Sequence, residues 1–224
     1  MDYALIVAGG SGKRMGSHKP KQFLLLDKQP VLLHTIKVFY RFSKSLKIII
    51  VLPQSEFSTW ESLVKEHDFN IPVTLIAGGE TRFDSVKNGL DSIHDSDGLV
   101  AIHDGVRPFV SIEVIKKCYD SARLHGSGVA AVTSKDSIRK ITGDQNISVL
   151  RDDYRLMQTP QTFNIKLIKE AYQMASHKEF TDDASLAESN GVKIRLVEGD
   201  YDNLKITTPE DLIIAQALLT KVKL

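Results

Sequence analysis

Short apolar runs alternate with longer segments of helical periodicity along most of this 224-residue chain. The runs are rich in Ile, Val and Leu and lack polar alternation, which is typical of a parallel sheet covered on both faces. The predicted strands are Tyr3–Ala8, Lys47–Leu52, Val73–Ala77, Leu99–His103 and Val129–Val132. The predicted helices between them are Val31–Phe42, Glu56–Glu66, Phe83–Ile93 and Ile112–His125. Repeated βα units of this length predict an α/β protein with a doubly wound, mostly parallel sheet.

The pattern changes over residues 134–155, where apolar and polar residues alternate around Gly143-Asp144-Gln145-Asn146. This alternation predicts a β-hairpin. Because a two-stranded ribbon is not stable alone, we expect it to project as an arm and to pack on something else, such as a second copy of the chain. The alternative is a surface hairpin that packs on its own domain.

Three further elements are predicted after the hairpin. Asn164–Ala175 and Thr181–Ser189 have helical spacing, and Val192–Val197 alternates like a half-buried strand. The string Thr208-Pro209-Glu210-Asp211 supplies an N-cap, a proline at the first helical position and two acids in the first turn of a last helix. No flexible linker interrupts the chain, so we expect one domain over residues 1–224.

Composition excludes several classes of protein. The net charge of +1 gives no basic field for nucleic acid or for an anionic membrane. The single cysteine, Cys118, excludes an internal disulfide, and its apolar surroundings predict a small core residue. No apolar run approaches the length of a membrane span and no signal peptide is recognisable, so we expect a soluble, cytoplasmic protein.

The segment from Ala8 to Phe23, AGGSGKRMGSHKPKQF, places three glycines and several basic residues directly after the first strand. A glycine-rich turn after a strand directs several backbone N–H groups to one point, which suits an anion. The basic side chains add full charges, so the segment predicts a pocket for a polyphosphate, most simply a nucleoside triphosphate. The alternative is a solvated basic loop between a strand and a helix.

Two common phosphate-binding motifs are absent from this segment. It lacks the G-x-x-x-x-G-K-[ST] string of a P-loop. Gly10 and Gly12 fit the dinucleotide fingerprint G-x-G-x-x-G, but Met15 stands at the position of the third glycine. Both a P-loop ATPase and a nicotinamide dehydrogenase are therefore disfavoured.

Other polar clusters follow the predicted strands, where ligands of such folds bind. Residues 77–82, AGGETR, are followed by Ser85, and their two glycines would let the backbone approach a flat ligand. The alternative is a tight turn with Ser85 in the first helical turn. Asp104 ends the fourth strand, a natural place for a carboxylate near Mg²⁺, and Arg107 could bind a second anion. Alternatively, Asp104 caps a turn and pairs with Arg107. His103 is expected to be a packed histidine.

Three later strings complete the candidates. These are Thr159-Pro160-Gln161, Thr181-Asp182-Asp183 and Asp202-Asn203-Leu204-Lys205. Lys205 is a single cation between apolar residues just before a helix, a good position to hold a phosphate. For the second string the alternative is helix capping by Thr181 and Asp182, with Asp183 as a charge in the first turn.

The chain resembles the methylerythritol phosphate cytidylyltransferase family in a series of short strings that occur in the family's order, from Tyr3 to about Leu219. The strings are AGGSGKRMG, KPKQF, AGGETRFDSV, HDGVRPF, KDSI, QTPQTF, TDDAS and DNLKITTPEDL. The resemblance implies a Rossmann-like nucleotidyltransferase fold, CTP and methylerythritol phosphate as substrates, Mg²⁺ as cofactor, and a homodimer in which the hairpin arm embraces the second subunit. The alternatives are a ribitol phosphate cytidylyltransferase and a non-catalytic nucleotide-binding protein of the same fold.

The resemblance also implies roles for individual residues. The catalytic cations would be Arg14 and Lys21. The nucleotide would be bound by Ala8, Gly9, Gly10, Ser11, Gly12, Lys13, Gly79, Glu80 and Ser85. The sugar phosphate would be bound by Asp104, Arg107, Ser137, Arg151, Thr159, Thr181 and Lys205, with Asp104 also near the metal. Ser137 and Arg151 belong to the arm, so they are expected to serve the site of either the same or the neighbouring subunit.

Overall fold

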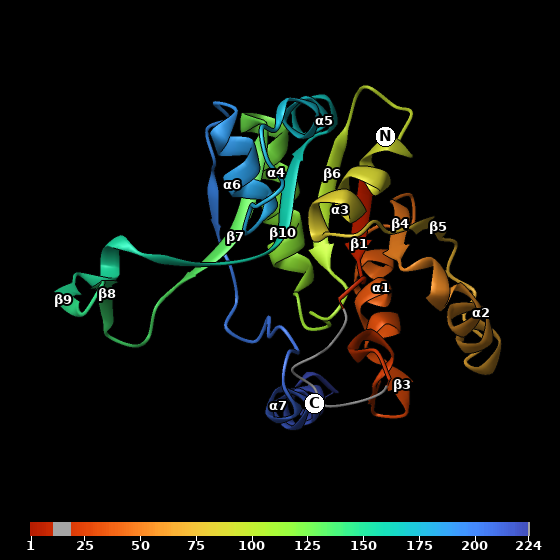
Figure 1. Cartoon of the computed structure of the whole chain (residues 1–224). Helices are drawn as coiled ribbons and strands as arrows, with labels where there is room; N and C mark the ends of the chain where they lie inside the picture. The colour runs from red at the N-terminus through yellow and green to blue at the C-terminus, as the bar shows by residue number, and fades with distance from the viewer. Residues whose placement is uncertain (11–18, 224) are drawn as a thin grey trace.

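The computed structural model describes residues 1–10 and 19–223, and a seven-stranded sheet forms its centre (Figure 1). In spatial order the strands are β11 (Leu196–Glu198), β7 (Ser127–Thr133), β10 (Arg155–Asn164), β6 (Leu99–Asp104), β1 (Tyr3–Val7), β4 (Lys47–Leu52) and β5 (Thr74–Ala77). All neighbouring pairs are parallel except those of β10, which runs antiparallel to both β6 and β7. The predicted mostly parallel α/β sheet is confirmed.

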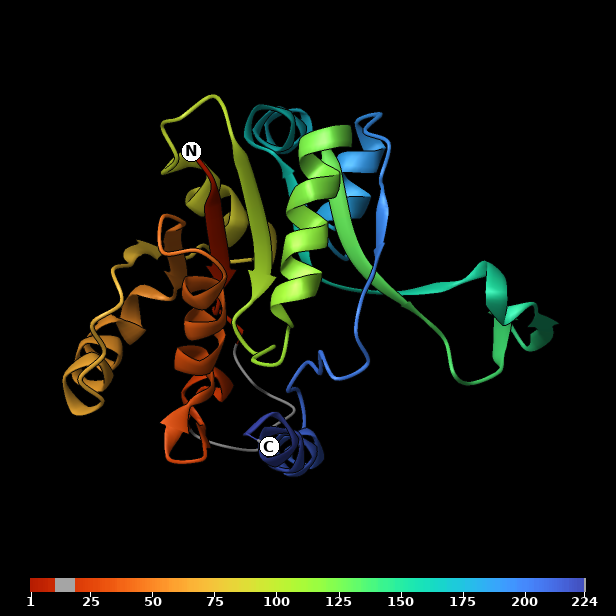
Figure 2. The same ribbon diagram turned by 180° about the vertical axis from the view of Figure 1, so that it is seen from behind.

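Helices cover both faces of this sheet (Figures 1 and 2). One face carries α1 (Val31–Phe42), α2 (Phe57–Glu66) and α4 (Ile112–His125). The other carries α3 (Arg82–Asp91), α5 (Ile165–Met174) and α6 (Asp183–Ser189). On β1, Ala4 and Ile6 pack into the first layer while Leu5 packs into the second, so a continuous apolar run is buried from both sides. Cys118 is fully buried in the first layer, as predicted.

The C-terminal helix α7 (Pro209–Lys223) lies at one end of the body beside a small hairpin of β2 (Leu25–Leu26) and β3 (Gln29–Pro30). It begins at Pro209, as the sequence predicts. Ala215 packs with Leu26 and Val106 in a separate small core. None of the described helices is long and apolar enough to cross a membrane.

One strand prediction is wrong, and one strand was missed. The strand expected over Val192–Val197 is only three residues long, Leu196–Glu198. Strand β10 was not predicted at all, because proline and the polar residues of QTPQT interrupt its apolar pattern. Both glutamines are buried but hydrogen-bonded: the Gln158 amide donates to the carbonyl of Asp200 at 2.8 Å, and the Gln161 amide donates to Asp182 Oδ2 at 2.8 Å.

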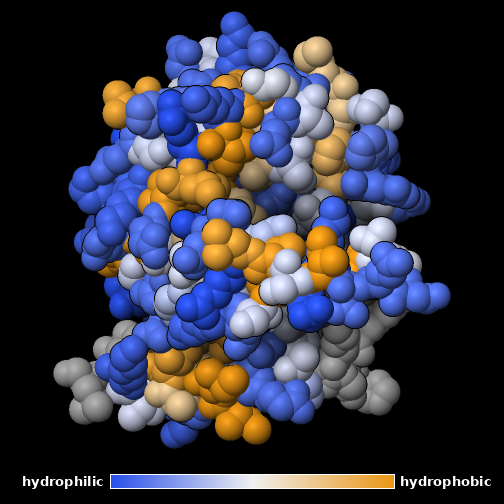
Figure 3. Space-filling model, turned by 90° about the vertical axis from the view of Figure 1, so that its left-hand side faces the viewer, coloured by the Kyte–Doolittle hydropathy of each residue, from blue (hydrophilic) through white to orange (hydrophobic). Residues whose placement is uncertain are grey.

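The arm over residues 134–155 projects from the body as a separate two-stranded sheet (Figures 1 and 2). Its strands are β8 (Ile138–Thr142) and β9 (Gln145–Val149), joined by a turn in which Gly143 has φ +59°. Ile141, Ile147 and Leu150 are largely exposed on it. Figure 3 shows apolar side chains among polar ones on the face from which the arm projects. The projecting hairpin is confirmed, and the alternative that it packs on its own domain is wrong.

Candidate functional site

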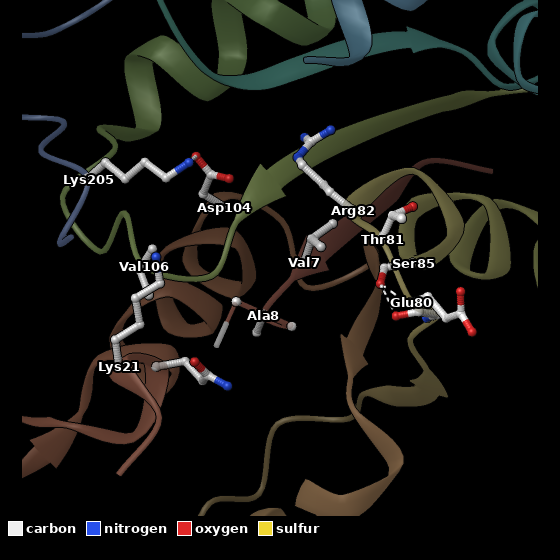
Figure 4. Close-up of a pocket in the computed structure, with 14 residues that line it drawn as sticks. Val7, Ala8, Lys21, Glu80, Thr81, Arg82, Ser85, Asp104, Val106 and Lys205 are labelled. Atoms are coloured by element: carbon white, nitrogen blue, oxygen red, sulfur yellow. Dashed lines mark hydrogen bonds and ion pairs between the residues drawn. The ribbon is translucent and has the colours of Figure 1, made fainter. Parts of the chain in front are cut away.

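The carboxyl ends of β1, β5 and β6 open onto a cavity of about 330 Å³ (Figure 4). It is lined by many of the residues predicted to bind the nucleotide and its reaction partner: Ala8, Gly9, Gly10, Lys21, Gly79, Glu80, Ser85, Asp104 and Lys205. Ser11, Gly12, Lys13 and Arg14, which belong to the same predicted loop, lie outside the described residues. The cavity lies where an open α/β sheet binds its ligands.

Lys21 and Lys205 lie on one side of this cavity, and Glu80, Thr81 and Ser85 lie on the other (Figure 4). A Cβ at Gly10 would lie 3.1 Å from Cε of Lys21, so the absence of a side chain at Gly10 gives the lysine stem room to pass. The cavity therefore has a basic side, suited to phosphates, and a polar side suited to a base.

The polar side is a tight turn between β5 and α3. The backbone N–H of Gly79 donates to Oγ of Ser85 at 3.1 Å, and Thr81 and Asp84 form a capping box at the start of α3. A Cβ at Gly79 would lie 2.3 Å from Cβ of Asp84, so only glycine fits there. The alternative predicted for this segment, a tight turn with Ser85 in the first helical turn, describes its geometry. The same residues nevertheless line the cavity.

Asp104, the last residue of β6, is the centre of a charge cluster. Its Oδ2 accepts from Nε of Arg107 at 2.9 Å and lies 3.1 Å from Nζ of Lys205. Arg107 also donates from Nη1 to the carbonyl of Asn203 at 2.8 Å. Burial works to raise the pKa of Asp104, but the charges of Lys205 and Arg107 outweigh it and hold that pKa well below its usual range. The predicted alternative, a pair between Asp104 and Arg107, is thus present within the site.

A second cavity, of about 190 Å³, adjoins the first and is lined by the body residues predicted to bind the sugar phosphate. Arg107, Thr159 and Thr181 line it, and Arg82, Asp104 and Lys205 line both cavities. Residues predicted for the two substrates therefore meet along a shared border.

Thr159 links this border to the core. Its hydroxyl accepts from the backbone N–H of Asp104 at 3.1 Å and lies 3.1 Å from Nδ1 of His103. Nε2 of His103 lies 3.1 Å from the carbonyl of Arg107, to which it donates when Nδ1 accepts from Thr159. Burial lowers the pKa of His103 to about 4, so the ring is neutral at pH 7. His103 is the packed histidine that was predicted.

Ser137 and Arg151 line neither cavity. They lie on the arm, away from the body, and Arg151 donates to the carbonyl of Lys135 at 2.9 Å. The structure of one chain does not bring these two predicted residues to its own site.

Comparisons with known proteins give the family. The model of the 2-C-methyl-D-erythritol 4-phosphate cytidylyltransferase family matches residues 3–221. The chain belongs to this family. The cytidylyltransferase of Bacteroides fragilis is 49% identical over 216 residues, 96% of this chain and 98% of that protein. The enzyme of Bacteroides thetaiotaomicron is 47% identical over 215 residues, again 96% of this chain and 98% of that protein.

Solved structures of the family have the same fold. The 4-diphosphocytidyl-2C-methyl-D-erythritol synthase of Anaerococcus prevotii superposes with a TM-score of 0.84 at 32% identity, covering 98% of this chain and 96% of that one. The cytidylyltransferase of Thermus thermophilus superposes with a TM-score of 0.79 at 30% identity, covering 98% and 100%. The predicted Rossmann-like fold and family are confirmed, and the ribitol phosphate alternative is not favoured.

Sequence reasoning missed the position of Arg82, which lines both cavities of this cytidylyltransferase-family chain. Its guanidinium donates to both carboxylate oxygens of Asp183, at 2.9 and 2.6 Å. Asp183 is fully buried, and its Oδ1 also accepts from the hydroxyl of Tyr172 at 2.6 Å. Asp183 is an acid in the first turn of α6, as the capping alternative proposed, with Asp182 as N-cap. The one available signal was an arginine beside the glycines of AGGETR.

Proposed function

We propose that this protein transfers a cytidylyl group from CTP to 2-C-methyl-D-erythritol 4-phosphate, giving 4-diphosphocytidyl-2-C-methyl-D-erythritol and pyrophosphate. Members of its family are CTP-dependent cytidylyltransferases, a class of nucleotidyltransferase. One observation in this chain carries the proposal: a nucleotide-sized cavity and a smaller cationic cavity share a border formed partly by Asp104 and Lys205.

The reaction needs two anions to meet. A phosphate oxygen of the sugar phosphate forms a bond to the α-phosphorus of CTP, and the bond from that phosphorus to the bridging oxygen of the β-phosphate breaks, so pyrophosphate leaves with its electron pair. Lys21, Lys205 and Arg107 line the two cavities and would offset the repulsion. Arg14, outside the described residues, keeps its predicted catalytic role.

No covalent enzyme intermediate is required. Cys118, the single cysteine, is fully buried, and burial raises the pKa of its thiol to about 12. The protein's contribution is therefore to position the two substrates and to stabilise charge on the transferring phosphoryl group.

Mg²⁺ is the proposed cofactor, and the chemistry of Asp104 fits it. The two cations that contact Asp104 do so at Oδ2, and Oδ1 makes no hydrogen bond or ion pair with the described residues. The described residues contain no cluster of three His, Cys, Asp or Glu side chains that could hold a metal by themselves. A single carboxylate together with phosphate oxygens and water is a common set of ligands for Mg²⁺, which would neutralise phosphate charge.

The arm supports a homodimer. It carries exposed Ile141, Ile147, Leu150 and Tyr154 on a ribbon that is not stable alone. A second copy of the chain would cover these side chains, and a two-fold interface would bring each arm to the other subunit. Ser137 and Arg151 would then contribute to the partner's sugar-phosphate cavity, which explains why they lie away from their own.

A pyrophosphate-release assay tests this function. The purified protein is incubated with Mg²⁺, each of the four ribonucleoside triphosphates, and either methylerythritol phosphate or ribitol phosphate. We expect release only with CTP, and a clear preference for methylerythritol phosphate. A preference for ribitol phosphate would favour the related transferase, and tight CTP binding without release would favour a non-catalytic nucleotide-binding protein.

A further inference from the structure

Three described residues line both cavities, and one of them has no role in the function derived so far. Asp104 and Lys205 are predicted substrate and metal contacts, whereas no role is predicted for Arg82. Figure 4 shows its side chain leaving the start of α3 and directed away from Glu80, toward the side of the cavity where Asp104 lies. Arg82 is therefore at the place where the nucleotide and the sugar phosphate would meet.

A buried network fixes the orientation of this guanidinium. Asp183 accepts from Nη1 at 2.9 Å and from Nη2 at 2.6 Å, and Tyr172 donates to the same carboxylate. Asp183 is fully buried, and one-third of the Arg82 side chain remains exposed. The carboxylate thus holds the inner edge of the guanidinium, while part of the side chain faces the cavities.

Unused donors remain on this side chain. An arginine has five N–H groups, and the hydrogen bonds to Asp183 use two of them. The Tyr172 hydroxyl is also close enough to engage a third, so two N–H groups remain for a ligand. A planar guanidinium with fixed donors matches two oxygens of a phosphoryl group, a geometry that a lysine ammonium cannot reproduce.

A purely structural link between α3 and α6 would not need these groups. Burying an ion pair carries a desolvation cost that packed apolar side chains avoid, so the pair is weak evidence for stability alone. The position of the pair at the border of the two cavities indicates a functional reason for a buried ion pair here.

We propose that Arg82 is a further catalytic residue, which donates hydrogen bonds to the phosphoryl group as it passes from CTP to the sugar phosphate, and that Asp183 is its positioning residue. The proposal rests on the cytidylyltransferase function. Because the contact strengthens as charge develops on the transferring group, it acts mainly on kcat and little on the binding of CTP.

The test compares kcat with the dissociation constant of CTP in matched variants. Arg82→Lys keeps the charge and loses the planar donors; we expect kcat to fall about a hundredfold and CTP affinity to change less than about threefold. Asp183→Asn keeps the side-chain shape and loosens the arginine, so we expect about a tenfold loss of kcat. Lys87→Gln removes an exposed ion pair on the same helix and serves as the control, with unchanged kcat.

A double variant covers the case in which a single change leaves an unpaired buried charge and the chain does not fold. Arg82→Gln with Asp183→Asn removes both charges together, and we expect a folded protein whose kcat is again about a hundredfold lower. The proposal is overturned if kcat of Arg82→Lys or of the folded double variant stays within about threefold of wild type, or if weaker CTP binding accounts for the whole loss. If the wild-type protein is active and the variants have the same kcat, only the role of Arg82 is refuted. If the wild-type protein shows no cytidylyltransferase activity, the proposed function is refuted as well.

Discussion

The body and the arm differ in how far their predicted site residues are buried and paired within the chain. In the body, Asp104 is 8% exposed and has two cationic partners from its own chain. On the arm, the side chain of Arg151 is 51% exposed, and its carboxylate partner, Asp152, lies 3.8 Å away. The contacts of Asp104 are short and its carboxylate is buried, whereas an exposed pair like that of Arg151 contributes little.

This difference shows which part of the site one chain can organise by itself. The sheet and its helices orient the charges at the border of the two cavities through contacts within the same chain. The arm presents apolar side chains, such as those of Ile141 and Ile147, that are largely exposed in one chain, so we expect a partner subunit to complete it. The predictions below test each half of this comparison.

The largest effect is expected at Lys21, in the body. Lys21→Ala should lower kcat about a hundredfold, because it removes a preorganised cation of the kind that stabilises phosphoryl transfer, worth about 3 kcal/mol. The free energy of unfolding should change little, since the residue lines the cavity rather than the core. Steady-state kinetics and urea unfolding measure the two quantities. Lys116→Ala, which breaks an exposed pair with Asp120, is the control with neither effect. Wild-type turnover in Lys21→Ala would remove this residue from the mechanism.

The next largest effect concerns the buried support of the body site. His103 is fully buried, and burial lowers its pKa to about 4, below the ordinary value of 6.5. Between these values the unfolded chain binds a proton that the folded chain does not, so stability is full above about pH 6.5 and falls as the pH drops toward 4. The loss attributable to this residue is on the order of 3 kcal/mol.

Urea unfolding at a series of pH values between 7 and 4 checks this expectation, with His103→Gln as the comparison. The variant cannot titrate, so its stability should fall less steeply over this range. The lowered pKa of Asp104 acts in a lower window, because that contribution disappears only as the pH falls below the ordinary value of 3.8. Equal slopes for the two proteins between pH 6.5 and 4 would show that His103 is not held neutral.

The third prediction tests the arm by subunit complementation. Lys21→Ala has a damaged body and an intact arm, and Arg151→Ala has the reverse. When the two are co-expressed in equal amounts, half of the dimers are mixed, and each mixed dimer has one site with an intact body and an intact arm. We expect about a quarter of wild-type activity, well above that of either variant alone.

The control pairs Lys21→Ala with Asp104→Asn, two body variants. These damage different residues of one cavity, but every mixed site still lacks one of them, so no activity should return. Failure of the first pair to recover activity would mean that Arg151 does not serve the neighbouring site, and the contrast between body and arm would lose its functional meaning.

Sequence reasoning predicted the strands and site residues that local sequence patterns determine. Buried parallel strands such as β4 and β6 have continuous apolar runs, and ligand residues follow from their carboxyl ends, as Asp104 shows. Strand β10 was missed because most of its buried residues are polar, and its glutamines are hydrogen-bonded to residues far along the chain, such as Asp200 for Gln158. A pattern rule that equates burial with apolar character cannot predict it.

The roles of Arg82 and Asp183 were missed for a similar reason. Arg82 and Asp183 are 101 residues apart, and each has an adequate local explanation as a residue of a helix start. Only the packing of α3 near α5 and α6 brings them together at the border of the cavities. Roles that depend on such long-range pairs are not visible in the spacing of either string.

The smallest effect is expected from two glycines that differ only in where they lie. Gly143, at the tip of the arm, has φ +59°, and Gly191, in the body after α6, has φ +81°; a Cβ would meet no atom within 4 Å at either. Alanine at each position therefore costs only backbone strain, about 1 kcal/mol. Gly191→Ala should lower the free energy of unfolding by that amount and leave the dimer dissociation constant unchanged.

Gly143→Ala should do the opposite. If the arm is completed by a partner rather than by its own body, the strain weakens the dimer about fivefold while the unfolding of the body stays the same. Analytical ultracentrifugation gives the dissociation constant, and denaturant unfolding of the dissociated chain gives the stability. Should Gly143→Ala destabilise the monomer as much as Gly191→Ala does, the arm folds as part of the body, and its exposed side chains need an explanation other than a partner subunit.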